Sequence, residues 1–175
     1  MSGRVSYEES CRLLQSQGFL DAGDIPSLPA RAPHFDDEQI GISFFRTRLA
    51  DVKLDGLTLP RVFFGRSEIR NVSFRGTDLS ESTANWNDFI DVDFSGADLS
   101  RADLRASIFD RVSFRGANLC GVDLRWATFR KCDFTGTDMT DAKATRAFTW
   151  LLRLSRHQRR TIDWQTDSGP EPDGG

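Results

Sequence analysis

A five-residue period of apolar side chains constrains this chain more than any other feature of its sequence. Sampling every fifth residue from Phe44 to Met139 gives twenty positions, of which nineteen are large and apolar. Neither an α-helix nor a plain strand has a period of five. The residue two positions before each sample is mostly small or β-branched, as at Val92, Ala97 and Ala102. Residues two apart in extended backbone point to the same side, so each unit offers two inward side chains and then requires a turn.

A second period of twenty residues is superimposed on the first. Glycine recurs three residues before members of the apolar series, at Gly56, Gly76, Gly96, Gly116 and Gly136. Four five-residue units therefore form one coil with four sides. Stacked coils place each inward residue on its equivalent twenty positions away, which predicts four side-chain ladders, among them one of Phe and one of Leu. The twenty units predict five coils, a rod about 24 Å long at the spacing of paired strands.

The units resemble a known family. Ala97-Asp98-Leu99-Ser100-Arg101 is similar to the A(D/N)Lxx consensus of the pentapeptide-repeat proteins, as are the units that begin at Ala102 and Ala117. The resemblance extends over about residues 42–144. It implies an all-β fold, a right-handed quadrilateral β-helix in which the central Leu or Phe and the small residue two before it face inward.

Ala84 is the one small residue at a central position of the series. Its neighbours are also atypical, because Asn87 stands where the pattern has a small or β-branched residue. We expect a local cavity, a bulge, or a cover from outside by Trp86 in the third coil.

The ends of a solenoid need caps, because unpaired strand edges and apolar side chains are otherwise exposed there. Residues 1–41 are predicted to form an N-terminal helix and capping loop. Ser6 begins a capping-box pattern, which predicts a helix over about 7–17 that stops at Gly18. The hydroxyl of Tyr7, the one tyrosine, is expected to reach water on this cap. The loop that follows contains Pro26, Pro29 and Pro33 and should run onto the first coil.

Residues 145–165 are predicted to carry a C-terminal amphipathic helix from Thr145 to about His157. The arginines of this segment suit a helix C-terminus, so direct nucleic-acid binding is not expected. The family resemblance implies that such a segment can support a homodimer. The candidates for the cap or the dimer contact are Phe148, Trp150, Leu151, Leu152 and Leu154. Residues 166–175 are predicted to be a disordered tail.

The composition shows no sign of catalytic or cofactor chemistry. Three cysteines form no CxxC pair, two histidines form no zinc-type cluster, and no nucleophile, phosphate-binding or dinucleotide motif occurs. We therefore expect no catalytic residue, cofactor or metal. Cys132 occupies an inward slot equivalent to Val112 and is expected to be a core residue. No membrane-length apolar stretch and no signal peptide occur, which predicts a cytoplasmic protein.

A column of carboxylates precedes the Leu ladder at Asp78, Asp98 and Asp138, with Asn118 between them. Such a column suits either cation binding or imitation of DNA phosphates. The interpretation that we favour is structural, because Asp and Asn side chains commonly bond to the backbone of a turn.

Function is expected in the outward residues that break the regular pattern. Trp86 and Trp126 belong to one outward column, with isoleucines nearby, and exposed Trp flanked by Ile and Arg is typical of a protein-binding hot spot. The partner-binding candidates are Trp86, Trp126, Ile90, Ile108, Arg105, Arg125 and Arg130.

Two kinds of non-enzymatic function follow. The first is a binding module whose rigid surface engages a protein partner, including an immunity or effector-type protein that binds a toxin. The second, implied by the family, is a DNA mimic that protects DNA gyrase from toxins or fluoroquinolones. The repeat does not favour the mimic, because residues 42–143 carry 15 basic and 15 acidic groups and mimicry needs a continuous negative surface.

Overall fold

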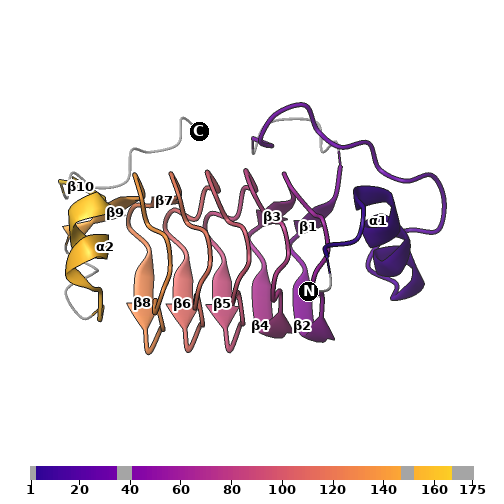
Figure 1. The fold of residues 1–175 in the computed structure, drawn as a ribbon. Coiled ribbons are helices and arrows are strands. Elements are labelled where there is room, and N and C mark those ends of the chain that lie inside the picture. Colours follow the sequence, from indigo (N-terminus) through magenta and orange to yellow (C-terminus); the bar gives the residue numbers. More distant parts are fainter. Residues whose placement is uncertain (1–2, 35–40, 147–151, 167–175) are drawn as a thin grey trace, which may run out of the picture.

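The computed structural model describes residues 3–34, 41–146 and 152–166. They form a four-sided solenoid with helix α1 (Tyr7–Ser16) at one end and helix α2 (Arg156–Thr161) at the other (Figure 1). The strands are β1 (Ser43–Phe45), β2 (Arg48–Lys53), β3 (Phe63–Gly65), β4 (Glu68–Ser73), β5 (Asp88–Ile90), β6 (Ile108–Asp110), β7 (Asp123–Leu124), β8 (Thr128–Arg130), β9 (Lys143–Thr145) and β10 (Asp163–Gln165).

Successive coils pair in parallel with a register of twenty residues. The longest sheet has the order β2-β4-β5-β6-β8, and its central residues pair as Leu49↔Ile69, Phe89↔Phe109 and Phe109↔Phe129. The sides without regular strands keep the same register through single bridges such as Asp78↔Asp98. The twenty-residue period of the sequence is therefore the spacing of the hydrogen-bonded coils.

The solenoid has about six turns, slightly more than the about five coils that the repeat predicted. The additional turn is completed by β10, which lies beyond the repeat pattern of the sequence. After β9 the chain leaves the coil path, forms α2 and returns at β10, where Asp163 pairs with Lys143 in the same register of twenty. The repeat pattern stops at Met139, and for this reason it did not reveal the last strand.

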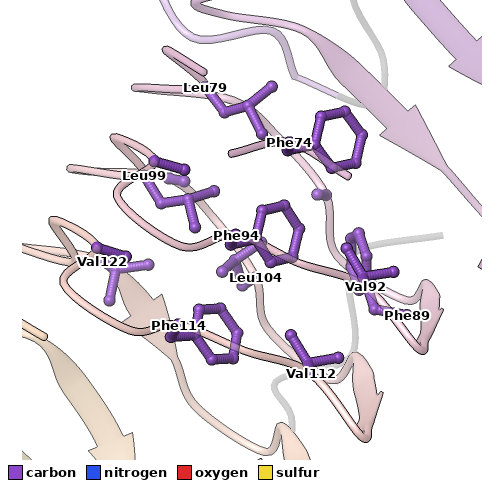
Figure 2. Close-up of a cluster of buried hydrophobic side chains, with 14 of the residues drawn as sticks. Phe74, Leu79, Phe89, Val92, Phe94, Leu99, Leu104, Val112, Phe114 and Val122 are labelled. Atoms are coloured by element: carbon purple, nitrogen blue, oxygen red, sulfur yellow. The ribbon is translucent and has the colours of Figure 1, made fainter. Parts of the chain in front are cut away.

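The core consists of stacked side chains, as predicted. The rings of Phe74, Phe94 and Phe114 lie one above another (Figure 2), with centroids 5.3 and 5.5 Å apart. A second phenylalanine ladder begins at Phe89, whose ring lies 5.1 Å from that of Phe109. The two ladders meet edge to face, so phenylalanine fills two columns here rather than one. Offset stacks and edge contacts are the arrangements that the quadrupoles of aromatic rings favour.

A left-handed backbone conformation occurs at every fifth residue. The twenty positions from 46 to 141 in steps of five all have φ between +50° and +69°. Glycine occupies six of them, and the other fourteen carry side chains as large as Trp86 and Trp126. A residue with a Cβ pays about 1 to 2 kcal/mol for this conformation, so the stacked coils impose it against local preference.

The irregular unit around Ala84 leaves a cavity of about 10 Å³. Its lining includes Phe64, Leu79 and Leu104, and Ala84 itself is buried. Of the three outcomes expected from the sequence, the structure confirms the cavity. The cause is the shortage of side-chain volume between Phe64 and Leu104, which precede and follow Ala84 in the same column.

Asn87, the second irregular residue, is buried and fully bonded. Its Oδ1 accepts from the backbone N–H of Ser67 at 2.7 Å, and its Nδ2 donates to the carbonyls of Phe64 at 2.6 Å and Asn85 at 2.9 Å. A buried amide without these partners would be costly. The polar substitution in this inward slot therefore links two coils instead of destabilising them.

Helix α1 covers the first coil as predicted. The hydroxyl of Ser6 accepts from the N–H of Glu9 at 3.1 Å, and Gly18 follows the helix with φ +77°. Cys11 and Leu14 are buried against the solenoid. The loop beyond α1 is anchored where Arg61 donates to the carbonyl of Pro29 at 2.7 Å.

The expectation for Tyr7 is wrong. Its hydroxyl is buried and has no hydrogen-bond partner among the described residues. Burial raises the pKa of the Tyr7 phenol well above its ordinary value.

The C-terminal helix begins later than predicted. Residues 143–145 belong to β9, residues 152–155 are not helical, and α2 begins at Arg156. A capping box explains the start, because Ser155 accepts from the N–H of Gln158 and the Gln158 side chain accepts from the N–H of Ser155. Leu152 is buried and Leu154 packs on the core, both as parts of the cap. Phe148, Trp150 and Leu151, like the tail from 167 onward, lie outside the described residues.

Filling the cavity should stabilise the protein. We expect Ala84→Leu to raise the free energy of unfolding by about 1 kcal/mol, because a leucine would continue the column of Leu104. Urea denaturation measures this change. Ala117→Leu is the matched control, since Ala117 is also buried but does not line this cavity and should lose about 1 to 3 kcal/mol through overpacking. Equal losses in the two variants would contradict the cavity assignment.

The left-handed corners predict an unusual response to glycine. Ala106 has φ +53°, so Ala106→Gly should stabilise the protein or leave it unchanged by relieving about 1 kcal/mol of strain. Ala50 has similar exposure but lies in β2, where Ala50→Gly should destabilise by about 0.5 to 1 kcal/mol. Thermal melts of both variants test the difference, and a larger loss at Ala106 than at Ala50 would refute it.

Candidate functional site

One corner of the solenoid exposes large apolar side chains. Trp86 is 54% exposed and Ile108 is 49% exposed. They are neighbours, because Ile108 pairs with Asp88, two residues after Trp86. Ile90 ends strand β5, which begins at Asp88, and its side chain is partly exposed. We call Trp86, Ile90 and Ile108 the apolar corner.

Trp126 does not share the exposure of Trp86, although both belong to the same column. It is partly buried, and its indole N–H has no hydrogen-bond partner among the described residues. The guanidinium of Arg125 lies over its ring, 5.1 Å from the centroid. Its backbone N–H donates to the hydroxyl of Thr145 at 3.1 Å. The prediction of two exposed tryptophans is therefore wrong for Trp126, because Thr145, the last residue of β9, lies in the next layer at this corner.

The predicted polar rim consists of arginines that are all paired. Arg105 forms two bonds of 2.9 Å with Asp103. Arg125 holds Asp123 in the same way, at 2.9 and 2.7 Å. Arg130 donates from Nε to Asp110 at 2.9 Å. These guanidiniums have fixed positions beside the apolar corner.

Sequence reasoning missed a third exposed apolar residue at this corner, Phe45. It is 42% exposed, and its ring lies 6.2 Å from the ring of Phe63. Gly65 makes this contact available, since a Cβ there would lie 2.5 Å from the ring of Phe63 and 2.7 Å from that of Phe45. The sequence signal for this contact is Gly65, because a glycine leaves the space that the two rings need.

Arg46 and Arg48 lie on the first coil, and Arg66 and Arg70 lie on the second. The guanidinium of Arg46 lies 5.1 Å from the centroid of the Phe45 ring. Glu68 lies within 3.5 Å of Arg48 and 3.1 Å of Arg70. One carboxylate thus serves two guanidiniums.

The column of carboxylates is structural, as favoured from the sequence. Asp78 accepts from the N–H of Ser80 at 2.9 Å, Asp98 from that of Ser100 at 3.0 Å, and Asp138 from that of Thr140 at 3.0 Å. Asn118 makes the equivalent bond to Cys120. Each side chain thereby satisfies a backbone donor at its turn.

Ion pairs between coils neutralise much of the remaining surface. Arg61 and Arg101 both bind Glu81, and these bonds hold the pKa of the Glu81 carboxyl below its ordinary value. Bonds from Arg130 and Arg111 lower the pKa of Asp110 in the same way. These carboxylates are ionised near neutral pH and are occupied by their partners.

The described residues offer little else for chemistry. They contain no group of three or more His, Cys, Asp or Glu side chains that could hold a metal ion. Cys132 lies in its inward slot, bonds to the carbonyl of Phe109 at 3.4 Å, and has a pKa raised to about 11 by burial. No helix in this part of the chain is long and apolar enough to cross a membrane.

Comparisons with solved structures return proteins of the same repeat type. A pentapeptide repeat protein from the thylakoid lumen of Arabidopsis thaliana is 22% identical, with a TM-score of 0.38, over 68% of this chain and 69% of that one. The plasmid-mediated fluoroquinolone resistance protein QnrB1 is 22% identical, with a TM-score of 0.34, over 59% of this chain and 61% of that one. HetL from Nostoc is 15% identical, with a TM-score of 0.29, over 59% of this chain and 80% of that one.

Sequence comparison is decisive for the family. No curated protein matches the chain significantly. The family model for pentapeptide repeats matches residues 47–83, 88–125 and 107–143 in 8 copies. These matches span more than half of the chain and coincide with the coils that pair in the register of twenty. The protein belongs to the pentapeptide-repeat family.

Proposed function

We propose that this chain is a non-enzymatic binding module that holds a protein partner on the apolar corner. The observation that carries the proposal is the exposure of Trp86 and Ile108, 54% and 49%, on adjoining coils. Most other large apolar side chains of the repeat are buried in its ladders. Exposed apolar residues gathered at one place on a soluble protein are typical of interaction sites.

The composition of the corner supports a protein as the ligand. Tryptophan and arginine are enriched among residues that dominate binding energy at protein interfaces. Arg105 and Arg130 lie at the margin of the corner with their guanidiniums fixed by Asp103 and Asp110, so binding would order few additional side chains. A rigid surface loses less conformational entropy on association than a flexible one.

The alternative, a DNA mimic directed at a topoisomerase, has less support. Mimicry requires a continuous negative surface, whereas carboxylates such as Glu81, Asp91 and Asp110 are bound by arginines. The carboxylates of Asp78, Asp98 and Asp138 form a column, but their oxygens accept bonds from the backbone. A toxin or effector target would be one kind of partner for the binding module. The cytoplasmic location and the homodimer inferred from the sequence remain predictions.

The proposal predicts that partner capture depends on the apolar corner. The full chain, immobilised and exposed to a lysate of its own organism, should retain a partner that the double variant Trp86→Ala/Ile108→Ser loses by about tenfold or more. Alanine is tolerated at this left-handed corner, since Ala106 occupies the next coil at φ +53°. Thermal melts should therefore be nearly unchanged.

Leu28→Ser is the matched control, because Leu28 is 44% exposed but lies in the N-terminal loop. It should retain the same partner as the wild type. Identical retention by the corner variant and the wild type would refute the proposal.

A further inference from the structure

We propose that the open edge of strand β2 is a second binding surface, which takes one extended segment of a partner protein as an added strand. This edge is separate from the apolar corner, because β2 is the end strand of its sheet and lies two strands away from β5. The inference therefore goes beyond the proposed function and does not depend on it. Addition of a strand to an exposed sheet edge is a common mode of peptide recognition.

Backbone donors at two positions of β2 lack the acceptors that the later coils provide. The N–H of Asp88 donates to the preceding coil at 3.1 Å, and that of Asp93 does so at 3.0 Å. The equivalent residues of the first coil, forty positions earlier, are Arg48 and Lys53. Among the described residues, no strand pairs with β2 on the side of a preceding coil. Both N–H groups therefore face an open edge.

Backbone acceptors of β2 are open on the same side. The carbonyl of Asp93 accepts from the preceding coil at 2.8 Å, and that of Asp110 accepts at 2.9 Å. Their equivalents in the first coil are the carbonyls of Lys53 and Ala50. A row of free donors and acceptors along an edge strand is a template for pairing with another chain.

The N-terminal cap closes a different side of the first coil. Val5 donates to the carbonyl of Gly56 at 3.0 Å, and the N–H of Thr58 donates to the hydroxyl of Ser10 at 2.8 Å. These bonds replace a preceding coil at residues 56–58. None of the backbone bonds from the described part of residues 1–41 reaches β2. The cap thus leaves this edge available.

Val52 shows that the interior is also partly uncovered at this edge. The later members of its column, Val72, Val92 and Val112, are at most 2% exposed, whereas Val52 is partly exposed. Leu49, the other inward apolar residue of β2, is buried. An added strand would therefore place one apolar side chain on Val52, as Val52 itself lies on Val72.

The position of α1 favours a single segment over a second copy of this chain. The helix lies beyond the end of the first coil (Figure 1), where it would meet another solenoid before the two edges could pair. Arg48, Asp51 and Lys53 are exposed and carry charges of both signs. The edge therefore selects for an extended backbone with one apolar side chain rather than for charge.

Selection from a random dodecapeptide library, displayed on phage and presented to the immobilised full chain, tests the proposal. Selected peptides should bind the wild type at least tenfold more tightly than Lys53→Pro, because proline lacks the donor and its ring occupies the edge. Proline is compatible with this strand, since the N–H of residue 53 faces away from β4. Lys53→Ala is the matched control, because it removes the same charge but keeps the N–H, and it should bind as the wild type does.

Hydrogen exchange provides a measurement that does not depend on the proline variant. A selected peptide, added to the wild type, should slow exchange of the Arg48 and Lys53 amides by about tenfold or more. If thermal melts show that Lys53→Pro is less stable than Lys53→Ala, this measurement decides. Unchanged exchange at both amides overturns the proposal.

The outcomes separate this surface from the apolar corner. The selected peptides should bind Trp86→Ala/Ile108→Ser as they bind the wild type. Peptides that all require Trp86, or that bind folded Lys53→Pro and Lys53→Ala equally well, overturn the inference and leave the proposed function intact. Self-association of the wild type in sedimentation, lost in Lys53→Pro, also overturns it, in favour of a second copy as the occupant.

Discussion

Backbone hydrogen bonding between successive coils, in a register of twenty residues, is the interaction on which the rest of the structure depends. Each side of a coil donates to the next coil and accepts from it, as where Phe94 donates to the carbonyl of Ser113 at 2.8 Å and the carbonyl of Val92 accepts from the N–H of Ser113 at 3.0 Å. This register stacks similar side chains on one another. The ring centroids of Phe94 and Phe114 therefore lie 5.5 Å apart. It also maintains the left-handed corners, which cost free energy residue by residue.

The same lattice restricts where function can reside. Inward positions are filled by ladders, and many outward polar groups are occupied in turns or in ion pairs, as at Asp98 and Glu81. What remains for recognition are outward positions where the repeat tolerates any side chain. Trp86 and Ile108 use that freedom on adjoining coils. The proposed binding surface thus consists of side chains that depart from the repeat pattern and are held in place by the rigid solenoid.

Periodicity predicted the fold because every inward contact is repeated. The columns of Phe94 and Leu99, the cavity at Ala84 and the cap by α1 all follow from spacing and side-chain size. The later start of α2 also had a signal, because Ser155 and Gln158 have the spacing of a capping box, but the apolar residues upstream suggested a longer helix. The partial burial of Trp126 had no local signal, since it depends on the chain beyond the repeat. The contact of Phe45 with Phe63 depends on Gly65 one coil away, which no single unit reveals.

The unit of stacking is twenty residues and not five. Duplicating residues 92–111 within the chain adds one complete coil and leaves every column in register, whereas duplicating residues 107–111 alone moves all later columns to the next side. Urea denaturation should show a steeper transition with an unchanged or higher midpoint for the first variant, because a longer solenoid exposes more surface on unfolding. The second variant should unfold at a lower urea concentration than the wild type, since Phe114 would then stack on Leu99. A five-residue insertion as stable as the wild type, together with a destabilised twenty-residue insertion, would contradict the account.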